Sequence, residues 1–292
     1  MKSVPYIKMK KLNFIITITA CILSCSILAE ENIDIRDRVN NSVSLSALFA
    51  TMHYKEDNAR LYSIQDNSTM GLACDVRATF LKHIYTSFYA DFYGDDIFNH
   101  SSSGLTSEEL QKKNPNNPFF KGPIRADRFL NADIKLGYIL TEQLPVYIIP
   151  YIDVGYGNRI IKYDYRYYNV LHDPLSNNKT TYQSYKVIAG VMLQYPLLNN
   201  RIVLSPYIAL GKAFNIRMKN DILNLNTNVG NAPIYEGGVD INYHLYEGWF
   251  LSGFAKYLHI NCGTAEAKGL YYIPANNLNQ LQFGLGARYS FI

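Results

Sequence analysis

The last twelve residues of the chain, "LQFGLGARYSFI" (281–292), alternate between apolar and polar side chains almost to the carboxyl terminus. One set contains Leu281, Phe283, Leu285, Ala287, Tyr289 and Phe291, and the other contains Gln282, Gly284, Gly286, Arg288 and Ser290. Chain ends usually fray and lose regular structure. A two-residue period kept up to the terminus therefore predicts a β-strand with one apolar and one polar face, held in place by partners.

The same period recurs in "TMGLACDVRATF" (69–80), "NADIKLGYIL" (131–140) and "YEGGVDINYHL" (235–245). A soluble β-sandwich also produces such alternation, with the apolar face inside. Here the polar faces carry full charges and many glycines, as a narrow lumen requires, and Tyr and Phe lie near the segment ends, as in interfacial girdles. The pattern therefore favours strands whose apolar face points outward into lipid.

The connections between the predicted strands alternate in length. Short ones follow the second, fourth, sixth and eighth strands, whereas the others cover 55–67, 96–128, 164–180, 218–233 and 262–278. We predict an all-β, antiparallel up-and-down transmembrane β-barrel over 43–292 with short periplasmic turns and long extracellular loops. About ten strands are expected, although 8 or 12 also fit: 43–54, 68–80, 85–95, 129–140, 146–163, 181–196, 202–217, 234–246, 249–261 and 279–291.

Closure of the sheet meets a physical need. In hydrocarbon every backbone N–H and C=O must pair internally, which only helices and closed barrels achieve. A closed barrel also has no exposed sheet edge. The tail is therefore expected to be the last strand, paired with the first.

The amino-terminal segment carries the features of a secretory signal. Lys8, Lys10 and Lys11 precede the uncharged stretch "LNFIITITACILSCSILA" (12–29). A basic start, an apolar run and a small residue at the end predict a signal peptide over 1–29, cleaved after Ala29. Lipidation at Cys25 is the alternative. Residues 30–42 would then form a periplasmic segment ahead of the barrel.

The composition of the chain limits which partners and cofactors are expected. The chain has 28 Lys and Arg against 24 Asp and Glu, and the leader holds four of the lysines and no acid. The mature chain is thus balanced in charge, so nucleic acid is not an expected partner. Only Cys74 and Cys262 follow the leader, too few for a disulfide framework or a cysteine-based zinc site. We find no cofactor motif and expect no cofactor and no metal.

Charged residues on the polar faces are expected to point into the lumen. A small barrel is filled by its own side chains, and unpaired buried charge is costly. We therefore expect a plug of ion pairs, with a narrow water path lined by the same groups as the alternative, and a satisfied lumen histidine at His244. The candidates are Asp75, Arg77, Asp133, Lys135, Asp153, Glu236, Asp240, His244 and Arg288, together with Asp91, Lys186 and Lys256.

Two loop segments are candidates for contact with a partner. Phe119 and Phe120 lie in the longest connection, and Tyr165, Arg166 and Tyr167 lie in the next one. Loops on rigid scaffolds carry function, and aromatic and Arg side chains suit binding surfaces. These rings would equally suit a role in capping the barrel or meeting the outer leaflet. We expect a monomer surrounded by outer-membrane lipid, with a host or surface ligand bound through the loops.

Three signatures, the leader, "PYIDVGYG" (150–157) and "GLGARYSF" (284–291), resemble bacterial outer-membrane β-barrel proteins of the opacity-like and OmpX/OmpA-like group. That group usually has eight strands. The resemblance implies a Gram-negative cell envelope and roles in adhesion, immune evasion or limited permeability. It also implies that the barrel-assembly machinery reads an aromatic end, here Tyr289 and Phe291, although Phe291 is followed by Ile292.

Ten strands with long loops also resemble the omptin proteases, which activate water with acidic residues and an Asp–His pair. Asp91, Asp95, Asp96 and His100 are the candidates that this resemblance implies. Asp240 and His244 are four residues apart rather than two, which departs from the omptin pattern. We therefore expect a non-enzymatic surface or structural envelope protein, with a narrow porin as the alternative and an omptin-like protease as the less favoured reading.

Overall fold

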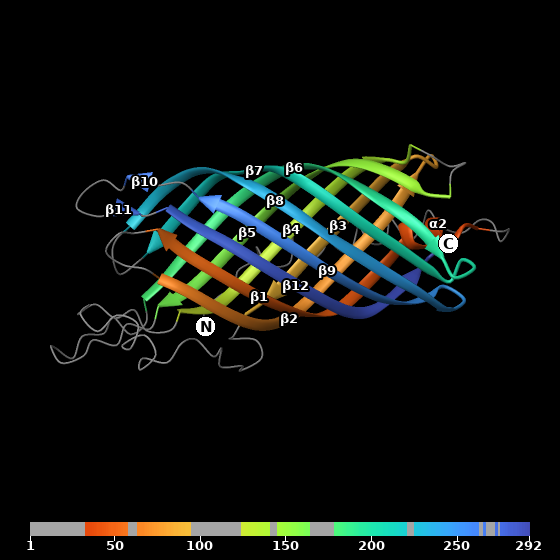
Figure 1. The fold of residues 1–292 in the computed structure, drawn as a ribbon, viewed down its shortest axis with the longest axis horizontal. Coiled ribbons are helices and arrows are strands. Elements are labelled where there is room, and N and C mark those ends of the chain that lie inside the picture. The colour runs from red at the N-terminus through yellow and green to blue at the C-terminus, as the bar shows by residue number, and fades with distance from the viewer. Residues whose placement is uncertain are drawn as a thin grey trace, which may run out of the picture.

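The computed structural model describes residues 33–57, 63–94, 124–140, 145–163, 178–220, 225–262, 265–266, 272–273 and 275–292. Ten strands form one closed antiparallel barrel, in which each pairs with the next barrel strand along the chain (Figure 1). The predicted ten-stranded all-β barrel is confirmed. Its strands are β1 (Ser42–Asp57), β2 (Ser63–Phe80), β3 (Ile84–Tyr93), β4 (Ile124–Tyr138), β5 (Tyr147–Tyr163), β6 (Asn178–Leu197), β7 (Ile202–Asn220), β8 (Leu225–Tyr246), β9 (Trp249–Cys262) and β12 (Ala275–Ser290).

The carboxyl-terminal strand closes the barrel. The register of β12 with β1 runs from Ser290 opposite Ser42 to Ala275 opposite Asp57. On its other edge β12 pairs with β9. The backbone N–H of Phe291 still donates to the carbonyl of Asn41, so pairing continues to the second-last residue. The regular tail is thus ordered by hydrogen bonds on both sides, as its alternation predicted.

The two ends of the barrel differ. At one, which we call the turn end, short turns follow β2, β6 and β8, and the carboxyl terminus and helix α2 (Ile35–Asn40) lie there (Figure 1). Asn199 and Asn200 both have positive φ, at 54° and 62°, in the turn between β6 and β7. Asn tolerates this left-handed conformation, which tight hairpins require. At the opposite, loop end lie β10 (Ala265–Glu266) and β11 (Tyr272–Ile273), which pair with each other.

Several strands extend further toward the loop end than the sequence indicated. Residues 218–233 were expected to form a long loop, but β7 ends at Asn220, β8 begins at Leu225, and these ends pair. The expectation was wrong because the register shifts after Ala213, where Asn215 has a φ of 50°. This bulge adds a residue and reverses the alternation, so the two-residue period appeared to stop. The first strand likewise runs on to Asp57 rather than ending at residue 54.

The outside of the barrel is an apolar belt. Leu45, Ile134, Ile208 and Leu285 are among its exposed side chains, and Ile208 is 71% exposed. On β8 the belt runs from Leu245 to Tyr235, which at 3.3 Å per residue and a tilt of about 40° spans roughly 25 Å along the barrel axis. That height matches the hydrocarbon band of an outer membrane. Exposed rings lie toward both ends of the belt: Tyr243, Tyr246, Trp249 and Tyr289 near the turn end, and Tyr185, Tyr235 and Tyr257 toward the loop end.

The inside changes character along its length. Toward the loop end most of the inward side chains are apolar and buried, among them Met52, Phe129, Ile216, Val229 and Ile234, and Gln280 is a buried polar exception. Nearer the turn end they are mostly charged or hydroxyl-bearing. The inward face of a single strand shows both regions, since β8 buries Val229, Ala232 and Ile234 first and then Glu236 and Asn242.

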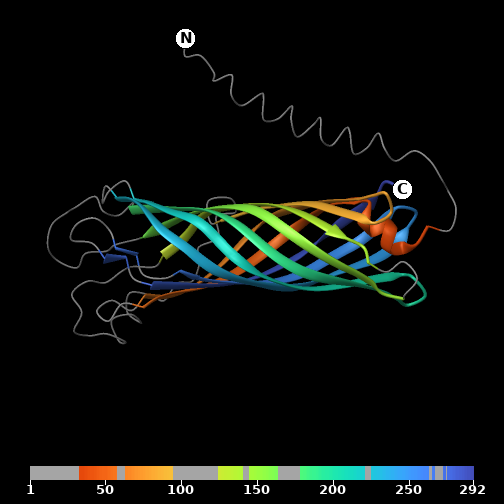
Figure 2. The same cartoon turned by 90° about the horizontal axis from the view of Figure 1, so that it is seen from above.

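Helix α2 lies in the mouth at the turn end, beside the start of β1 (Figures 1 and 2). Its apolar side chains Ile35 and Val39 pack against Val203 of β7 and Phe250 of β9. The helix begins where the Asp34 side chain accepts a hydrogen bond from the Arg36 backbone N–H, which is an ordinary N-cap. Among the helices in the described ranges, none is long and apolar enough to cross a membrane.

Candidate functional site

The first group of lumen charges lies near the turn end and is built on Asp75. Its Oδ2 accepts from Nε of Arg77 at 2.6 Å and from Nη2 of Arg288 at 2.7 Å. Arg77 also pairs with Asp240 of β8. Two carboxylates thus face two guanidinium groups, and we call these four residues the arginine network. Hydrogen bonds between ionised partners are the strong class, so the network ties β2, β8 and β12 together across the lumen.

Serines of β1 make room for Arg288. In the register, Ser44 lies opposite Arg288 on one side and opposite Asp75 on the other. A small side chain between them lets the guanidinium reach across β1. Arg288 also donates to Ser42 Oγ at 2.7 Å and, through Nε, to Asn242 Oδ1 at 2.9 Å. Its donors are therefore largely satisfied although the residue is only 2% exposed.

The second group lies further toward the loop end and consists of lysines and carboxylates. Lys186 Nζ lies 2.9 Å from Asp133 Oδ2 and 3.3 Å from Glu236 Oε2. Lys256 Nζ also lies 3.3 Å from Glu236 Oε2. Asp153, which is fully buried, is 3.9 Å from Lys186. We call these residues, with Lys135, the lysine network; its three lysines balance its three carboxylates.

A glycine makes the lysine network sterically feasible. Gly155 of β5 lies opposite Asp133 on one side and opposite Lys186 on the other. A Cβ on Gly155 would approach Asp133 Oδ1 to 2.1 Å and Lys186 Cε to 2.5 Å. Lys186 can therefore cross β5 to reach Asp133 only because the residue between them has no side chain.

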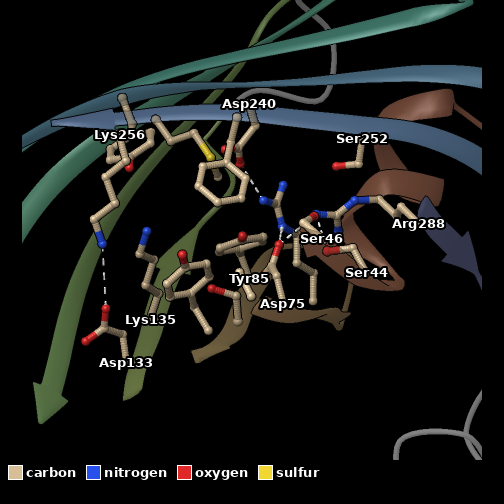
Figure 3. A pocket seen from close by; sticks show the side chains of 17 residues that line it. Ser44, Ser46, Asp75, Tyr85, Asp133, Lys135, Asp240, Ser252, Lys256 and Arg288 are labelled. Atoms are coloured by element: carbon tan, nitrogen blue, oxygen red, sulfur yellow. Dashed lines mark hydrogen bonds and ion pairs between the residues drawn. The ribbon is translucent and has the colours of Figure 1, made fainter. Parts of the chain in front are cut away.

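A small cavity separates the two networks (Figure 3). Its volume is about 50 Å³, which holds a few water molecules but is too small for a hydrated solute to pass. Arg77, Tyr89 and Asp133 line it, and Arg77 Nη1, the Tyr89 hydroxyl and Asp133 Oδ1 are buried without a hydrogen-bond partner among the described residues. Buried polar atoms of this kind are normally satisfied by ordered water. Lys135 lies over the rings of Tyr151 and Tyr207, at 5.1 and 4.8 Å.

The turn-end mouth is closed by polar contacts as well as by packing. Asn40 and Gln194 exchange two amide hydrogen bonds, each of 2.8 Å, and both side chains are fully buried. The Arg36 guanidinium lies 3.7 Å from the centre of the Tyr147 ring. Burial alone would raise the pKa of Asp34, but the side-chain and backbone hydrogen bonds from Arg36 and its positive charge hold the pKa of that carboxyl below its ordinary value. The pKa of Arg36 is raised in turn, since pairing with Asp34 outweighs its burial.

The structure brings nearly all the candidate lumen residues together. Asp75, Arg77, Asp240 and Arg288 form the arginine network, and Asp133, Lys135, Asp153 and Glu236 belong to the lysine network. His244 stands apart at the turn end, where its Nε2 lies 2.7 Å from the carbonyl of Glu247. Asp240 and His244 therefore have different partners and do not form a dyad.

The other candidates lie elsewhere. Tyr289 is exposed on the outer face beside Trp249, with ring centres 5.0 Å apart, and Phe291 is partly buried. Asp91 is buried and bonded to Asn131. The loop candidates Phe119, Phe120, Tyr165, Arg166 and Tyr167, together with Asp95, Asp96 and His100, lie outside the described residues, as does the predicted leader.

Sequence reasoning missed the contacts of α2. The sequence pattern predicted no role for Arg36, Asn40, Tyr147 or Gln194, because a six-residue helix has too few turns for a periodic signal. The one available sign was Asp34 placed directly before Ile35, a common way to start a helix.

Neither a protein-family model nor a curated protein matches the chain in sequence. Among solved structures, the outer-membrane protease OmpT from Escherichia coli shares 7% identity and a TM-score of 0.48 over 85% of this chain and 95% of that one. Ail of Yersinia pestis, in complex with a heparin analogue, shares 10% identity and a TM-score of 0.34 over 85% and 98%. Neisserial surface protein A shares 10% identity and a TM-score of 0.34 over 85% of this chain and 96% of that one.

These likenesses concern the fold alone, and they carry nothing about activity. The architecture itself is that of a bacterial outer-membrane β-barrel: closed, antiparallel, even in strand number, and apolar on the outside.

Proposed function

We propose that the chain is an integral outer-membrane protein that does not conduct and that acts at the cell surface through its loop end, in adhesion or another contact with a host or envelope ligand. The observation that carries this proposal is the filled lumen. Within the described part of the chain, α2 closes the turn end, two ion-pair networks occupy the middle, and an apolar layer fills the loop end.

The cost of separating the paired charges in the two networks argues against a permanently open pore. A continuous water path would have to separate paired charges such as Asp75 and Arg288. Removing one partner of a buried pair typically costs about 3–5 kcal/mol, so pairing keeps these groups together across the lumen. A cavity of about 50 Å³ between the networks leaves no room for a hydrated solute.

The orientation follows from the connections. In barrels of this class short turns face the periplasm and long connections face outward. The turn end, with α2 and the carboxyl terminus, would thus be periplasmic. The loop end would carry three long connections, 95–123, 164–177 and 263–274, and two short ones, 58–62 and 221–224. A rigid barrel that presents long loops on one side suits recognition of a partner.

Conductance and topology can be tested on the same purified protein. In planar bilayers the folded barrel should give no stepwise current under conditions in which a porin, run in parallel, gives clear steps. Single Cys residues introduced at 102 and at 172, in a Cys74→Ser/Cys262→Ser background, should react with an impermeant thiol reagent on intact cells, whereas one at Lys82 should not. If the Cys at position 82 reacted while those at 102 and 172 did not, the orientation would be the reverse of the proposed one.

A narrow pore is the second candidate, because the cavity between the networks is polar and water-sized. In that case α2 would be the gate. Regular current steps from the complete chain would establish this reading and remove the non-conducting proposal.

The surface role needs its own test. Cells that display the protein should bind a host or envelope ligand, and replacing residues 96–122 by a short Gly-Ser linker should abolish that binding while the amount of folded barrel stays the same. The matched control replaces residues 221–224 in the same way. Equal binding by cells with and without the protein would leave the surface role unsupported.

A further inference from the structure

The cavity between the two networks has more basic than acidic residues in its wall. Among the described residues that line it, four are basic, namely Lys135, Lys256, Arg77 and Arg288, and three are acidic. Most of the others carry hydroxyl groups, which come from four serines and three tyrosines. Lys135 enters this space from β4 and Lys256 from β9 (Figure 3). The wall is therefore rich in groups that donate hydrogen bonds.

Lys135 lacks a carboxylate partner, although the charges of the lysine network balance in number. The other two lysines hold the carboxylates, since Nζ of Lys186 lies 2.9 Å from Asp133 Oδ2 and Nζ of Lys256 lies 3.3 Å from Glu236 Oε2. None of the ion pairs among the described residues includes Lys135. Its Nζ instead lies over two tyrosine rings, 4.8 and 5.1 Å from their centres. Ring faces attract an ammonium group, but they do not replace an acceptor for its three N–H donors.

Arg77 supplies a second charged donor that the described residues leave unpaired. Its Nε donates to Asp75 and its Nη2 donates to Asp240, but Nη1 is buried without a hydrogen-bond partner among the described residues. The hydroxyl of Tyr89, on the same cavity wall, is buried in the same state. Arg77 is only 6% exposed, so bulk water does not satisfy Nη1. An unpaired buried donor is costly, and a charged one especially so, which indicates that an acceptor occupies the cavity.

The unpaired acceptor on this wall, Asp133 Oδ1, lies to one side. It rests against Gly155 of β5, where a Cβ would approach it to 2.1 Å, and Gly155 does not line the cavity. The unpaired donors therefore outnumber the unpaired acceptors. A water molecule would accept two hydrogen bonds but would bring two hydrogens that need acceptors of their own. A small anion accepts several hydrogen bonds and brings none, and bonds from charged donors to an anion are the strong class.

We propose that the cavity binds one small monovalent anion, such as chloride, through Lys135 Nζ, Arg77 Nη1 and the Tyr89 hydroxyl. A volume of about 50 Å³ admits a single ion without its hydration shell and excludes organic anions. The ion links the lysine network to the arginine network, and it is a resident of the closed lumen, taken up as the barrel folds. The site is separate from the surface role of the loops and does not depend on it.

The test compares urea unfolding of the complete barrel in sodium chloride and in sodium gluconate at constant ionic strength, with the folded fraction read from heat-modifiable gel mobility. Gluconate is too large for the cavity, so the urea midpoint of the wild type should rise with the logarithm of the chloride concentration. Lys135→Met should lose this dependence. Tyr89→Phe, which deletes one hydroxyl, should bind chloride about tenfold more weakly. The control Lys82→Met, at an exposed turn, should respond to chloride like the wild type.

The position of the ion is tested directly in crystals grown in bromide, where anomalous difference density should lie in the cavity beside Lys135. Equal stability of the wild type in chloride and in gluconate would overturn the proposal. So would a chloride dependence of Lys135→Met that matches the wild type, or density in the cavity without anomalous signal, which would mean that water alone fills it. If Lys135→Met does not fold, Tyr89→Phe decides, because an unchanged chloride dependence in that variant would also refute the site.

Discussion

Replacing Asp75 by Asn should destabilise the barrel strongly, because Asp75 holds two guanidinium groups. The carboxylate accepts from Arg77 at 2.6 Å and from Arg288 at 2.7 Å, and the residue is only 8% exposed. The substitution keeps the shape and removes the charge, which leaves two arginines facing Asp240 alone. Breaking a buried pair in this way costs about 3–5 kcal/mol. The free energy of unfolding should fall by that amount.

A double-mutant cycle separates pairing from general disturbance. Arg288→Gln should also be costly, since it leaves Asp75 and Asp240 facing one arginine. The combination of both changes restores neutrality, so its cost should be less than the sum of the single costs by about 1–3 kcal/mol. Glu247→Gln, at an exposed turn, serves as the control and should change stability by less than about 0.5 kcal/mol.

The assay is urea unfolding from lipid vesicles, followed by fluorescence. Trp249 is the single tryptophan of the chain and lies exposed on the outer face, so its emission reports directly on the lipid environment. Gel mobility before and after heating provides an independent measure of the folded fraction. Strictly additive single costs would refute the reasoning, because Asp75 and Arg288 would then not depend on each other.

Three further predictions concern other parts of the wall. Leu285→Arg should lower the free energy of unfolding, measured by refolding from urea, by about 2–4 kcal/mol because the new side chain meets lipid. Gly284→Arg should instead prevent folding by crowding, since even a Cβ there would approach Phe254 to 2.1 Å. If Leu285→Arg were tolerated as well as a change in an exposed loop, the lipid face would be misassigned. Deleting residues 288–292 should abolish folded protein in outer-membrane fractions, and Phe291→Ala should lower its amount more than Ile292→Ala does; wild-type levels of the deletion on quantitative blots would contradict the closing role of the tail. The ionised form of Asp34 is favoured in the folded state, so its contribution is present above its ordinary pKa of 3.8 and is lost as the pH falls through the lowered pKa; hydrogen exchange of α2 should rise there, and Asp34→Asn should remove the dependence.

Strand identity and facing could be predicted because both depend on a local two-residue period. The alternation of "LQFGLGARYSFI" assigned Arg288 to the inside and Leu285 to the outside, as observed. The extent of β7 and β8 could not be predicted in the same way. The bulge at Asn215 interrupts the period, and the paired strands beyond it resembled a loop rich in Asn.

Pairing inside the lumen needed information that the sequence does not carry locally. That Asp133 meets Lys186 depends on the register of three strands and on the absence of a side chain at Gly155 between them. The sequence indicated which charges face inward but not which of them meet. Helix α2 is a related case, since its contacts with Tyr147 and Gln194 join segments more than a hundred residues apart.

The change of the inner face along β8 has a consequence for the height at which the loops are displayed. From Tyr235 to Leu225 the strand continues for ten more residues, with Ala232 and Val229 buried inside and Asn231 and Asn228 exposed outside. That is the arrangement of a water-soluble barrel, stacked without a break on a membrane-spanning one. At the same tilt these residues rise roughly 25 Å beyond the belt. The loops would therefore stand on a stiff collar well clear of the lipid headgroups, within reach of ligands that a barrel ending at the membrane surface would meet only through extended, flexible chain.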